Sequence, residues 1–237
     1  MIGKKKILGL VLARKNSKGL KNKNIKKIKG KETFLWPLSS FKKSKYVDIY
    51  TISTDSQTIL KKSKKNKIPI YFKRPVNLAK DNTPSYKPII HAINYFKKKK
   101  LLFDYIVLLE PTSPLTSAKD LDKAIEMIYR KKGKTLVSIG KINQLDPNYF
   151  FKVKNGVLKK FISKKLSTRR QDLKKLYYLD GSIYISEVSH FIKNQSFISS
   201  RTIPLIFPKF KNFEIDDITD FKIVKFIAEK KKILKKI

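Results

Sequence analysis

Short apolar runs alternate with helical patterns along the first 140 residues, and this alternation constrains the fold more than any other feature. Each run has the length of a buried strand and leads into a turn-rich loop or an amphipathic helix. The runs that predict strands are residues 7–13, 48–55, 68–72, 104–109 and 135–140. Strands that alternate with helices imply an α/β fold, with a Rossmann-like, mostly parallel central sheet and helices on both faces. Ligands of such sheets bind at the carboxyl ends of the strands.

The sequence pattern changes after residue 140. Apolar and polar residues alternate around Asn155-Gly156, which is the strongest short hairpin signal in the chain. We therefore expect one domain over residues 1–237, with an inserted β-hairpin arm at 141–180. Two further strands should return to the sheet, and a strand end should lead into a terminal helix near residue 217.

The chain carries 56 Lys and Arg residues against 18 Asp and Glu residues, a formal net charge of +38. Such a charge is often found in nucleic-acid-binding proteins. Here the lysines are spread over nearly every helical segment, and arginine is scarce beside lysine. This distribution favours solvated helix surfaces over a dedicated nucleic-acid face, although a general attraction to polyanions follows.

Cysteine is absent, and the two histidines, His91 and His190, are far apart in the sequence. Disulfides, Cys-ligated zinc, thiol nucleophiles and His-rich metal sites are therefore excluded, so a bound metal would need oxygen ligands. The chain has no apolar run of 18 residues, and its basic start is typical of a first strand rather than a signal peptide. We expect a cytoplasmic protein with no membrane segment.

The loop after the first apolar run has the composition of a phosphate-binding loop. Basic side chains offset phosphate charge, and a glycine lets backbone N–H groups approach the phosphate closely. The loop matches neither of the standard glycine-rich nucleotide motifs, and an ordinary solvated loop is the alternative. Its candidate residues are Arg14, Ser17, Lys18, Gly19, Lys21, Asn22, Lys23 and Asn24.

Eight short sequence motifs are distributed along nearly the whole chain. They are A-R-x-x-S-K-G-x-x-x-K-N, STDS, KRPVNLAKDNTPS, LLEPTSPL, LVSIG, RRQD, LDGSIYI and EIDDITDF. Together they resemble the acylneuraminate cytidylyltransferase family, which comprises CMP-sialate synthetases and their legionaminate and pseudaminate relatives. The resemblance implies transfer of CMP from CTP to an acidic nine-carbon sugar. It also implies a homodimer in which the arm reaches the neighbouring pocket.

The resemblance also implies roles for single residues on the nucleotide side. Arg14, Ser17, Lys18 and Lys23 would contact the triphosphate, and Asn24 and Arg74 would lie near cytosine and ribose. Arg74 precedes Pro75, which favours an extended backbone and a stiff turn, whereas simple pairing with Asp81 is the alternative. Ser85 would lie by the nucleotide, although N-capping of the following helix fits equally well.

On the sugar side, the resemblance points to Glu110, Thr112, Arg170, Gln171, Asp180 and Tyr184. Arg170 would suit the sugar carboxylate through a bidentate contact. Glu110 and Asp180 stand where family members that activate N-acetylneuraminate carry Gln and Asn. We expect these two carboxylates to change the orientation of an acidic sugar or to favour an amino-bearing substituent.

Glu214 and Asp216 are two residues apart on an expected strand, so both carboxylates should face one side. Mg²⁺ is typically held by one or two carboxylates together with substrate phosphates. We assign Asp216 first and Glu214 second as magnesium ligands. Members of the family that the chain resembles usually have Asp-x-Asp here, so Glu214 departs from that pattern. Asp217 and Asp220 are expected to cap the terminal helix.

The reaction would be in-line attack by the anomeric hydroxyl of the sugar on the α-phosphorus of CTP. Arg14, Lys18, Lys23 and Asp216 with its Mg²⁺ would stabilise the charge on the phosphoryl oxygens. Three alternatives stay open: a 3-deoxy-manno-octulosonate cytidylyltransferase, a basic nucleic-acid-binding protein and an inactive structural relative.

Overall fold

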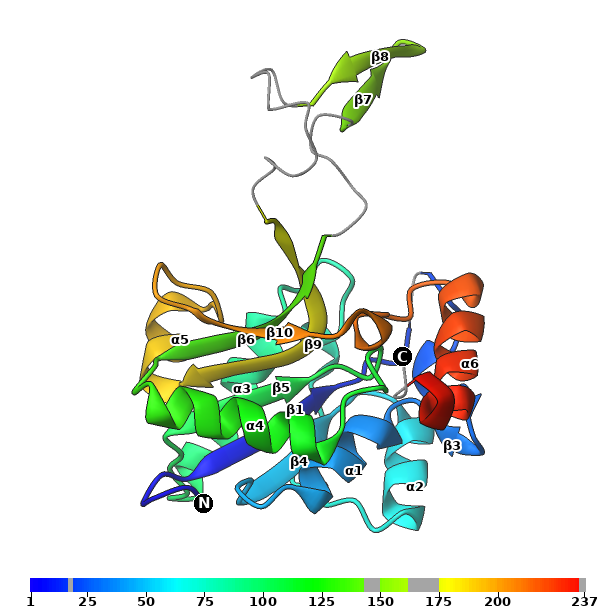
Figure 1. Ribbon diagram of the computed structural model, residues 1–237. Helices are drawn as coiled ribbons and strands as arrows, with labels where there is room; N and C mark the ends of the chain where they lie inside the picture. The colour runs from blue at the N-terminus through cyan, green and yellow to red at the C-terminus, as the bar shows by residue number, and fades with distance from the viewer. Residues whose placement is uncertain (17–18, 143–149, 162–174, 235–237) are drawn as a thin grey trace.

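A computed structural model describes residues 1–16, 19–142, 150–161 and 175–234, with side chains as far as residue 230. Its centre is a sheet of six strands in the order β10-β6-β9-β5-β1-β4 (Figure 1). Neighbouring strands are parallel except at β9, which runs antiparallel to both β5 and β6. The predicted α/β class with a mostly parallel sheet is therefore confirmed. The strands are β1 (Ile7–Leu12), β4 (Ile49–Ser53), β5 (Tyr105–Leu109), β6 (Thr135–Lys141), β9 (Tyr177–Glu187) and β10 (Ile203–Phe207).

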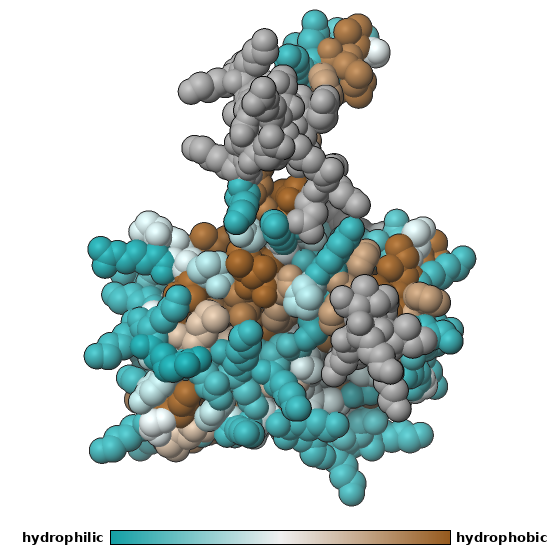
Figure 2. Space-filling view, in the orientation of Figure 1, coloured by the Kyte–Doolittle hydropathy of each residue, from teal (hydrophilic) through white to brown (hydrophobic). Residues whose placement is uncertain are grey.

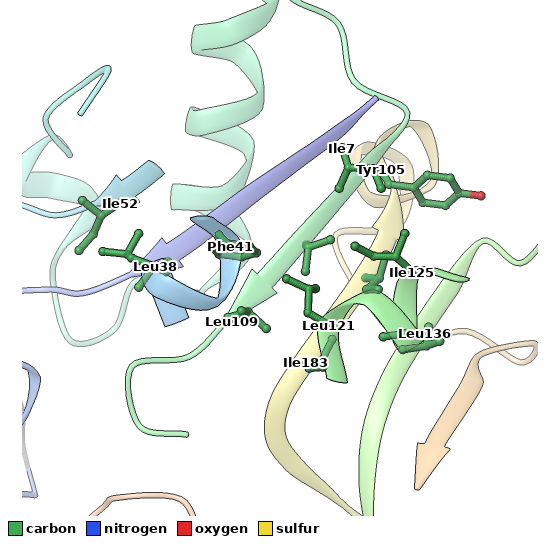
Figure 3. Close-up of a cluster of buried hydrophobic side chains, with 14 of the residues drawn as sticks. Ile7, Leu38, Phe41, Ile52, Tyr105, Leu109, Leu121, Ile125, Leu136 and Ile183 are labelled. Atoms are coloured by element: carbon green, nitrogen blue, oxygen red, sulfur yellow. The ribbon is translucent and has the colours of Figure 1, made fainter. Parts of the chain in front are cut away.

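Helices cover both faces of the sheet because alternate side chains of each strand point to opposite faces. In β1, Ile7 and Val11 join the buried cluster with α1 and α4, part of which Figure 3 shows. Leu8 and Leu10 join the cluster with α3 and α5 on the opposite face. The helices are α1 (Leu35–Lys43), α2 (Gln57–Lys65), α3 (Tyr86–Lys98), α4 (Ala118–Arg130), α5 (Val188–Asn194) and α6 (Ile218–Leu234).

A third, smaller cluster attaches α6 to the body. Val224 and Ile227 of α6 are buried with Ile28, Leu115 and Ile215, which come from three distant parts of the sequence. Short elements complete this region and the loops: η1 (Lys23–Ile25), β2 (Lys27–Ile28), β3 (Lys31–Glu32), η2 (Val76–Leu78) and η5 (Lys209–Lys211). Within the described ranges, no helix has both the length and the apolar character needed to cross a bilayer.

The predicted hairpin is present as β7 (Phe151–Lys154) and β8 (Val157–Lys160). Asn155 and Gly156 have φ angles of 52° and 74°, as a two-residue turn with two left-handed positions requires. The hairpin projects away from the body (Figure 1), and every residue of both strands is exposed. Its apolar side chains form a brown patch at the top of Figure 2.

Two predicted strands are wrong. Residues 68–72 run beside the edge strand β4 without forming a ladder of backbone hydrogen bonds. Pro69 has no N–H to donate, and its carbonyl accepts a hydrogen bond from the Thr51 hydroxyl at 3.1 Å. Residues 213–216 are likewise irregular, with the Ile215 N–H donating to the Thr112 carbonyl at 2.9 Å. A single hydrogen bond to a loop does not form a strand.

Candidate active site

A cavity of about 430 Å³ opens beside the carboxyl ends of β1 and β5, where a parallel sheet is expected to bind ligands. Most of the predicted site residues line it: Arg14, Gly19, Lys23, Asn24, Arg74, Ser85, Glu110, Thr112, Glu214 and Asp216. Ser17, Lys18, Arg170 and Gln171 lie outside the described residues. The sequence interpretation missed Lys80 and Thr83 as lining residues, although both belong to the quoted block KRPVNLAKDNTPS.

The loop that follows β1 is held in place by hydrogen bonds at several points. The backbone N–H of Ala13 donates to the Ser53 carbonyl at 3.1 Å, and that of Lys15 donates to the Asp55 carboxylate at 2.8 Å. The Asn24 side chain donates to the Arg14 carbonyl at 3.1 Å and so closes the loop on itself. A Cβ atom on Gly19 would overlap the Asp216 carbonyl, so only glycine permits this close approach of the loop to residue 216.

Arg14 and Lys23, the two described basic side chains of the loop that line the cavity, both have acidic partners. Arg14 forms an ion pair with Asp81, and Lys23 Nζ lies 3.3 Å from a carboxylate oxygen of Asp216. These ion pairs are partly exposed and therefore contribute little stability. Arg14 and Lys23 are consequently able to exchange their partners for phosphate oxygens.

Arg74 is the most buried of the described cations that line the cavity. Its side chain is 4% exposed, and its Nε and Nη2 atoms donate to the hydroxyl and the carbonyl of Ser53 at 2.9 and 2.7 Å. Burial lowers the pKa of the guanidinium to about 10, so it stays charged at neutral pH. The geometry favours a fixed ligand-binding role over the alternative of pairing with Asp81, which pairs with Arg14.

Ser85 stands directly before α3, where an N-cap would be. Its side chain forms no capping hydrogen bond, and the exposed residue lines the cavity instead. The geometry therefore favours a position beside the nucleotide over N-capping of α3 for Ser85.

Carboxylates dominate the part of the cavity after β5. Glu110 follows this strand directly and is partly buried. Burial, followed by the charge of Glu214, raises the pKa of Glu110 to about 7, against the opposing effects of Lys23 and Arg74. Glu214 accepts a hydrogen bond from the Thr112 hydroxyl at 2.8 Å, and burial also raises its pKa.

Asp180 and Tyr184 lie on β9 beside this cavity and do not line it. Asp180 is 2% exposed and accepts hydrogen bonds from the Ser138 hydroxyl and the Ser182 N–H. Its second carboxylate oxygen has no hydrogen-bond partner among the described residues. Tyr184 lines an adjoining cavity of about 190 Å³ that shares Ser85 with the larger one. Of the two carboxylates that replace amides, Glu110 alone faces the main cavity.

The 214–216 segment offers oxygen ligands for a cation. Glu214 and Asp216 flank the buried Ile215 and both line the cavity, although the segment is no strand. In the part of the chain that the structure describes, no group of three His, Asp or Glu side chains is arranged to hold a metal. One or two carboxylates completed by phosphate oxygens and water are what Mg²⁺ usually takes, and these residues fit that pattern.

The assignment of Asp217 and Asp220 to helix capping is confirmed. Asp217 accepts from the N–H groups of Thr219 and Asp220 at 2.7 and 2.9 Å. Asp220 accepts in turn from the N–H groups of Asp216 and Asp217 at 3.0 and 3.1 Å. This reciprocal cap fixes the start of α6, while the Asp216 side chain faces the cavity.

Comparison with known proteins identifies the family. Residues 8–236 match the model of the family described as Cytidylyltransferase. The chain is 32% identical over 231 residues to the post-translational flagellin modification protein B of Campylobacter coli, covering 96% of this chain and 97% of that protein. It is 30% identical over 230 residues to the CMP-N,N'-diacetyllegionaminic acid synthase of Campylobacter jejuni, and the match covers 96% of this chain and 97% of that protein.

A solved structure of CMP:2-keto-3-deoxy-manno-octonic acid synthetase complexed with CTP shares the fold. Its TM-score is 0.69 at 14% identity, and the match covers 95% of this chain and 99% of that one. The resemblance found in the ordered sequence blocks is confirmed by these relatives. The chain therefore belongs to the cytidylyltransferase family of CTP-dependent nucleotidyltransferases.

Proposed function

We propose that this cytidylyltransferase transfers CMP from CTP to the anomeric hydroxyl of a nonulosonic acid and releases pyrophosphate. The observation that carries the proposal is the single cavity that joins the β1 loop, Arg74 and the 214–216 segment. The names of relatives over nearly the full chain support the acceptor class, since they include synthases of CMP-linked legionaminic acid and a pseudaminic acid cytidylyltransferase.

The reaction forms a bond between the anomeric oxygen and the α-phosphorus and breaks the bond between the α-phosphorus and the bridging oxygen of pyrophosphate. The proton of the anomeric hydroxyl is released to solvent. Arg14 and Lys23 would leave Asp81 and Asp216 to neutralise the departing pyrophosphate. Arg74, held by Ser53, would fix the nucleotide without moving. Positioning and charge neutralisation supply most of the catalysis in phosphoryl transfer.

We propose Mg²⁺ as the cofactor, with Asp216 as the first protein ligand and Glu214 as the second. When bound, the ion would neutralise charge on the phosphate oxygens. Asp216 is the better candidate because its side chain is 75% exposed at the cavity, whereas Glu214 is already hydrogen-bonded to Thr112.

A homodimer through the arm at 141–180 is part of the same proposal, with Arg170 and Gln171 serving the neighbouring site. Val153 and Leu158 on the hairpin are 73% and 65% exposed, which suits burial against a second copy. Sedimentation of a Val153→Lys, Leu158→Lys double variant tests this. The dimer should dissociate while the body keeps its thermal midpoint, and an unchanged dimer would rule out the hairpin as the contact. We place the reaction in the cytoplasm, where CTP is synthesised.

Pyrophosphate release tests the function directly. The protein is incubated with CTP, Mg²⁺ and separately N-acetylneuraminate, legionaminate, pseudaminate or 3-deoxy-manno-octulosonate. A rate that depends on one of the nine-carbon sugars supports the proposal. A rate with the eight-carbon sugar alone favours the octulosonate alternative. Absence of CTP binding, together with salt-sensitive binding of random oligonucleotides, would favour the nucleic-acid alternative.

A further inference from the structure

The cavity is divided electrostatically along the sheet. Arg14 and Lys23 belong to the loop that follows β1, and Arg74 is attached to Ser53 at the end of β4. Glu110 follows β5, and Glu214 lies against Gly181 of β9. Because the sheet order places β1 and β4 on one side of β5 and β9, the cations and these carboxylates occupy different halves. A triphosphate fits the basic half, so the acceptor sugar is left with the acidic half.

Glu110 differs from every other carboxylate that lines the cavity. Glu214 accepts from Thr112, Asp216 pairs with Lys23, and Asp81 pairs with Arg14. The carboxylate of Glu110 has neither a hydrogen bond nor an ion pair among the residues that the structure describes. A partly buried charge without a partner is unfavourable, and the neighbouring Glu214 adds repulsion. A bound group that donates a hydrogen bond would relieve both costs.

We infer that Glu110 determines acceptor specificity by accepting a hydrogen bond from a nitrogen-bearing substituent of the sugar. This inference rests on the proposed function and names the class of acceptor within it. A bound donor favours the ionised form of Glu110, and an ionised carboxylate can only accept hydrogen bonds. The phosphates of CTP and the carboxylate of the sugar have no hydrogen to donate at neutral pH. The amino and ribose hydroxyl groups of CTP are placed with Arg74 in the basic half, which leaves the hydroxyl and nitrogen substituents of the sugar.

Hydroxyl groups occur on every sugar of this class, and a hydroxyl both donates and accepts, so hydroxyls discriminate poorly. A nitrogen substituent offers an N–H that only donates, either as an amide or as an ammonium. Glutamine at position 110 would both donate and accept, and would therefore also tolerate a group that only accepts. A carboxylate repels such a group, and specificity often arises from repulsion of the wrong ligand.

The test compares matched acceptors that differ at one carbon, which carries an acylamino group, a free amino group or a hydroxyl. The kcat/KM ratio of nitrogen-bearing to hydroxyl-bearing acceptor is measured for the wild type and for Glu110→Gln. Glu126→Gln is the matched control, since Glu126 lies on α4 and accepts from the Tyr46 hydroxyl away from the cavity. CTP affinity of each variant is measured by calorimetry, and thermal midpoints confirm folding.

We expect the wild type to prefer one nitrogen-bearing acceptor, and Glu110→Gln to reduce that preference about tenfold with CTP affinity unchanged. Preference for the amino over the acylamino acceptor identifies an ammonium as the donor, and the reverse identifies an amide. An unchanged ratio in Glu110→Gln would overturn the inference while the proposed function stands. Weakened CTP binding with lost discrimination against UTP would also overturn it, because Glu110 would then recognise the cytosine amino group. A wild type inactive with every nonulosonate would overturn both.

Discussion

The charged groups in the two halves of the cavity differ in whether they have partners within the protein. In the basic half, Arg14, Lys23 and Arg74 each have a partner within the protein, either a carboxylate or the two oxygens of Ser53. In the acidic half, the Glu110 carboxylate lines the cavity and has no hydrogen-bond or ion-pair partner among the described residues. The cations of the nucleotide half are therefore neutralised or held within the protein before ligand binding, whereas Glu110 in the acceptor half is satisfied only by a ligand.

The largest effect is expected at Asp216, where the two halves meet. Asp216→Ala should lower kcat about 1000-fold at saturating CTP, because the proposed magnesium ligand and the partner of Lys23 are lost together. Pyrophosphate release measures this. Asp217→Ala is the matched control and should retain turnover while losing about 1 kcal/mol of unfolding free energy with the α6 cap. Retained turnover in Asp216→Ala would mean that Asp216 only neutralises Lys23.

The unsatisfied charge of Glu110 should be visible as pH-dependent stability. The pKa of Glu110 is raised from 4.5 to about 7 in the folded protein, so between these values the unfolded chain releases a proton that the folded chain retains. The contribution of Glu110 to the free energy of unfolding is therefore fully present below about pH 4.5 and is lost as the pH rises to about 7. Relative to the wild type, Glu110→Gln should gain up to about 3 kcal/mol of unfolding free energy at pH 8 and nothing at pH 4. Urea unfolding at both pH values measures this, and a constant difference would contradict it.

A substitution in the basic half should act on the nucleotide alone. Arg74→Lys keeps the charge and loses the planar fork that reaches both oxygens of Ser53, which should weaken CTP binding by about 2 kcal/mol. Calorimetric titration with CTP measures the loss. Arg130→Lys at the exposed end of α4 is the control and should bind CTP as the wild type does. A higher KM for the acceptor at saturating CTP would show that Arg74 belongs to both halves.

The smallest effect is expected from Gly181→Ala in the acidic half. Gly181 has a φ of +68°, and an added Cβ would lie 2.5 Å from a carboxylate oxygen of Glu214. Strain and displacement of Glu214 should raise the acceptor KM about tenfold and leave CTP affinity unchanged. Gly30→Ala, at φ +75° with open space around it, controls for backbone strain. An equal effect of both substitutions would remove the specific role of the Gly181 contact.

The fold was largely predictable because its signals are local. Strand β1 and the Asn155-Gly156 turn follow from a continuous apolar run and from turn chemistry within a few residues. The strand expected at 68–72 was wrong because an apolar run does not reveal whether a neighbour offers a complete ladder. The chemistry of Pro69 settled that question at the edge of β4.

The site was predictable as a set of residues and not as a set of contacts. The sequence motifs predicted that Arg14, Asn24, Arg74 and Asp216 belong to one site, and in the structure all four line one cavity. The ion pair between Arg14 and Asp81 spans 67 residues of sequence, and no spacing rule predicts it. Likewise, nothing in the sequence distinguishes Glu110, which faces the cavity, from Asp180, which lies beside it.

The α/β class, the composition of the loop after β1 and the carboxylates that depart from the family pattern can all be read from the sequence, because each is a property of residue types and short-range order. Which charged groups come into contact depends on how the chain packs. The sheet order places the chain segments after β1 and β4 beside those after β5 and β9, and the burial at that junction sets each group's partner and pKa. Burial and electrostatic pairing depend on distance in space, which this chain establishes only when its distant segments pack together.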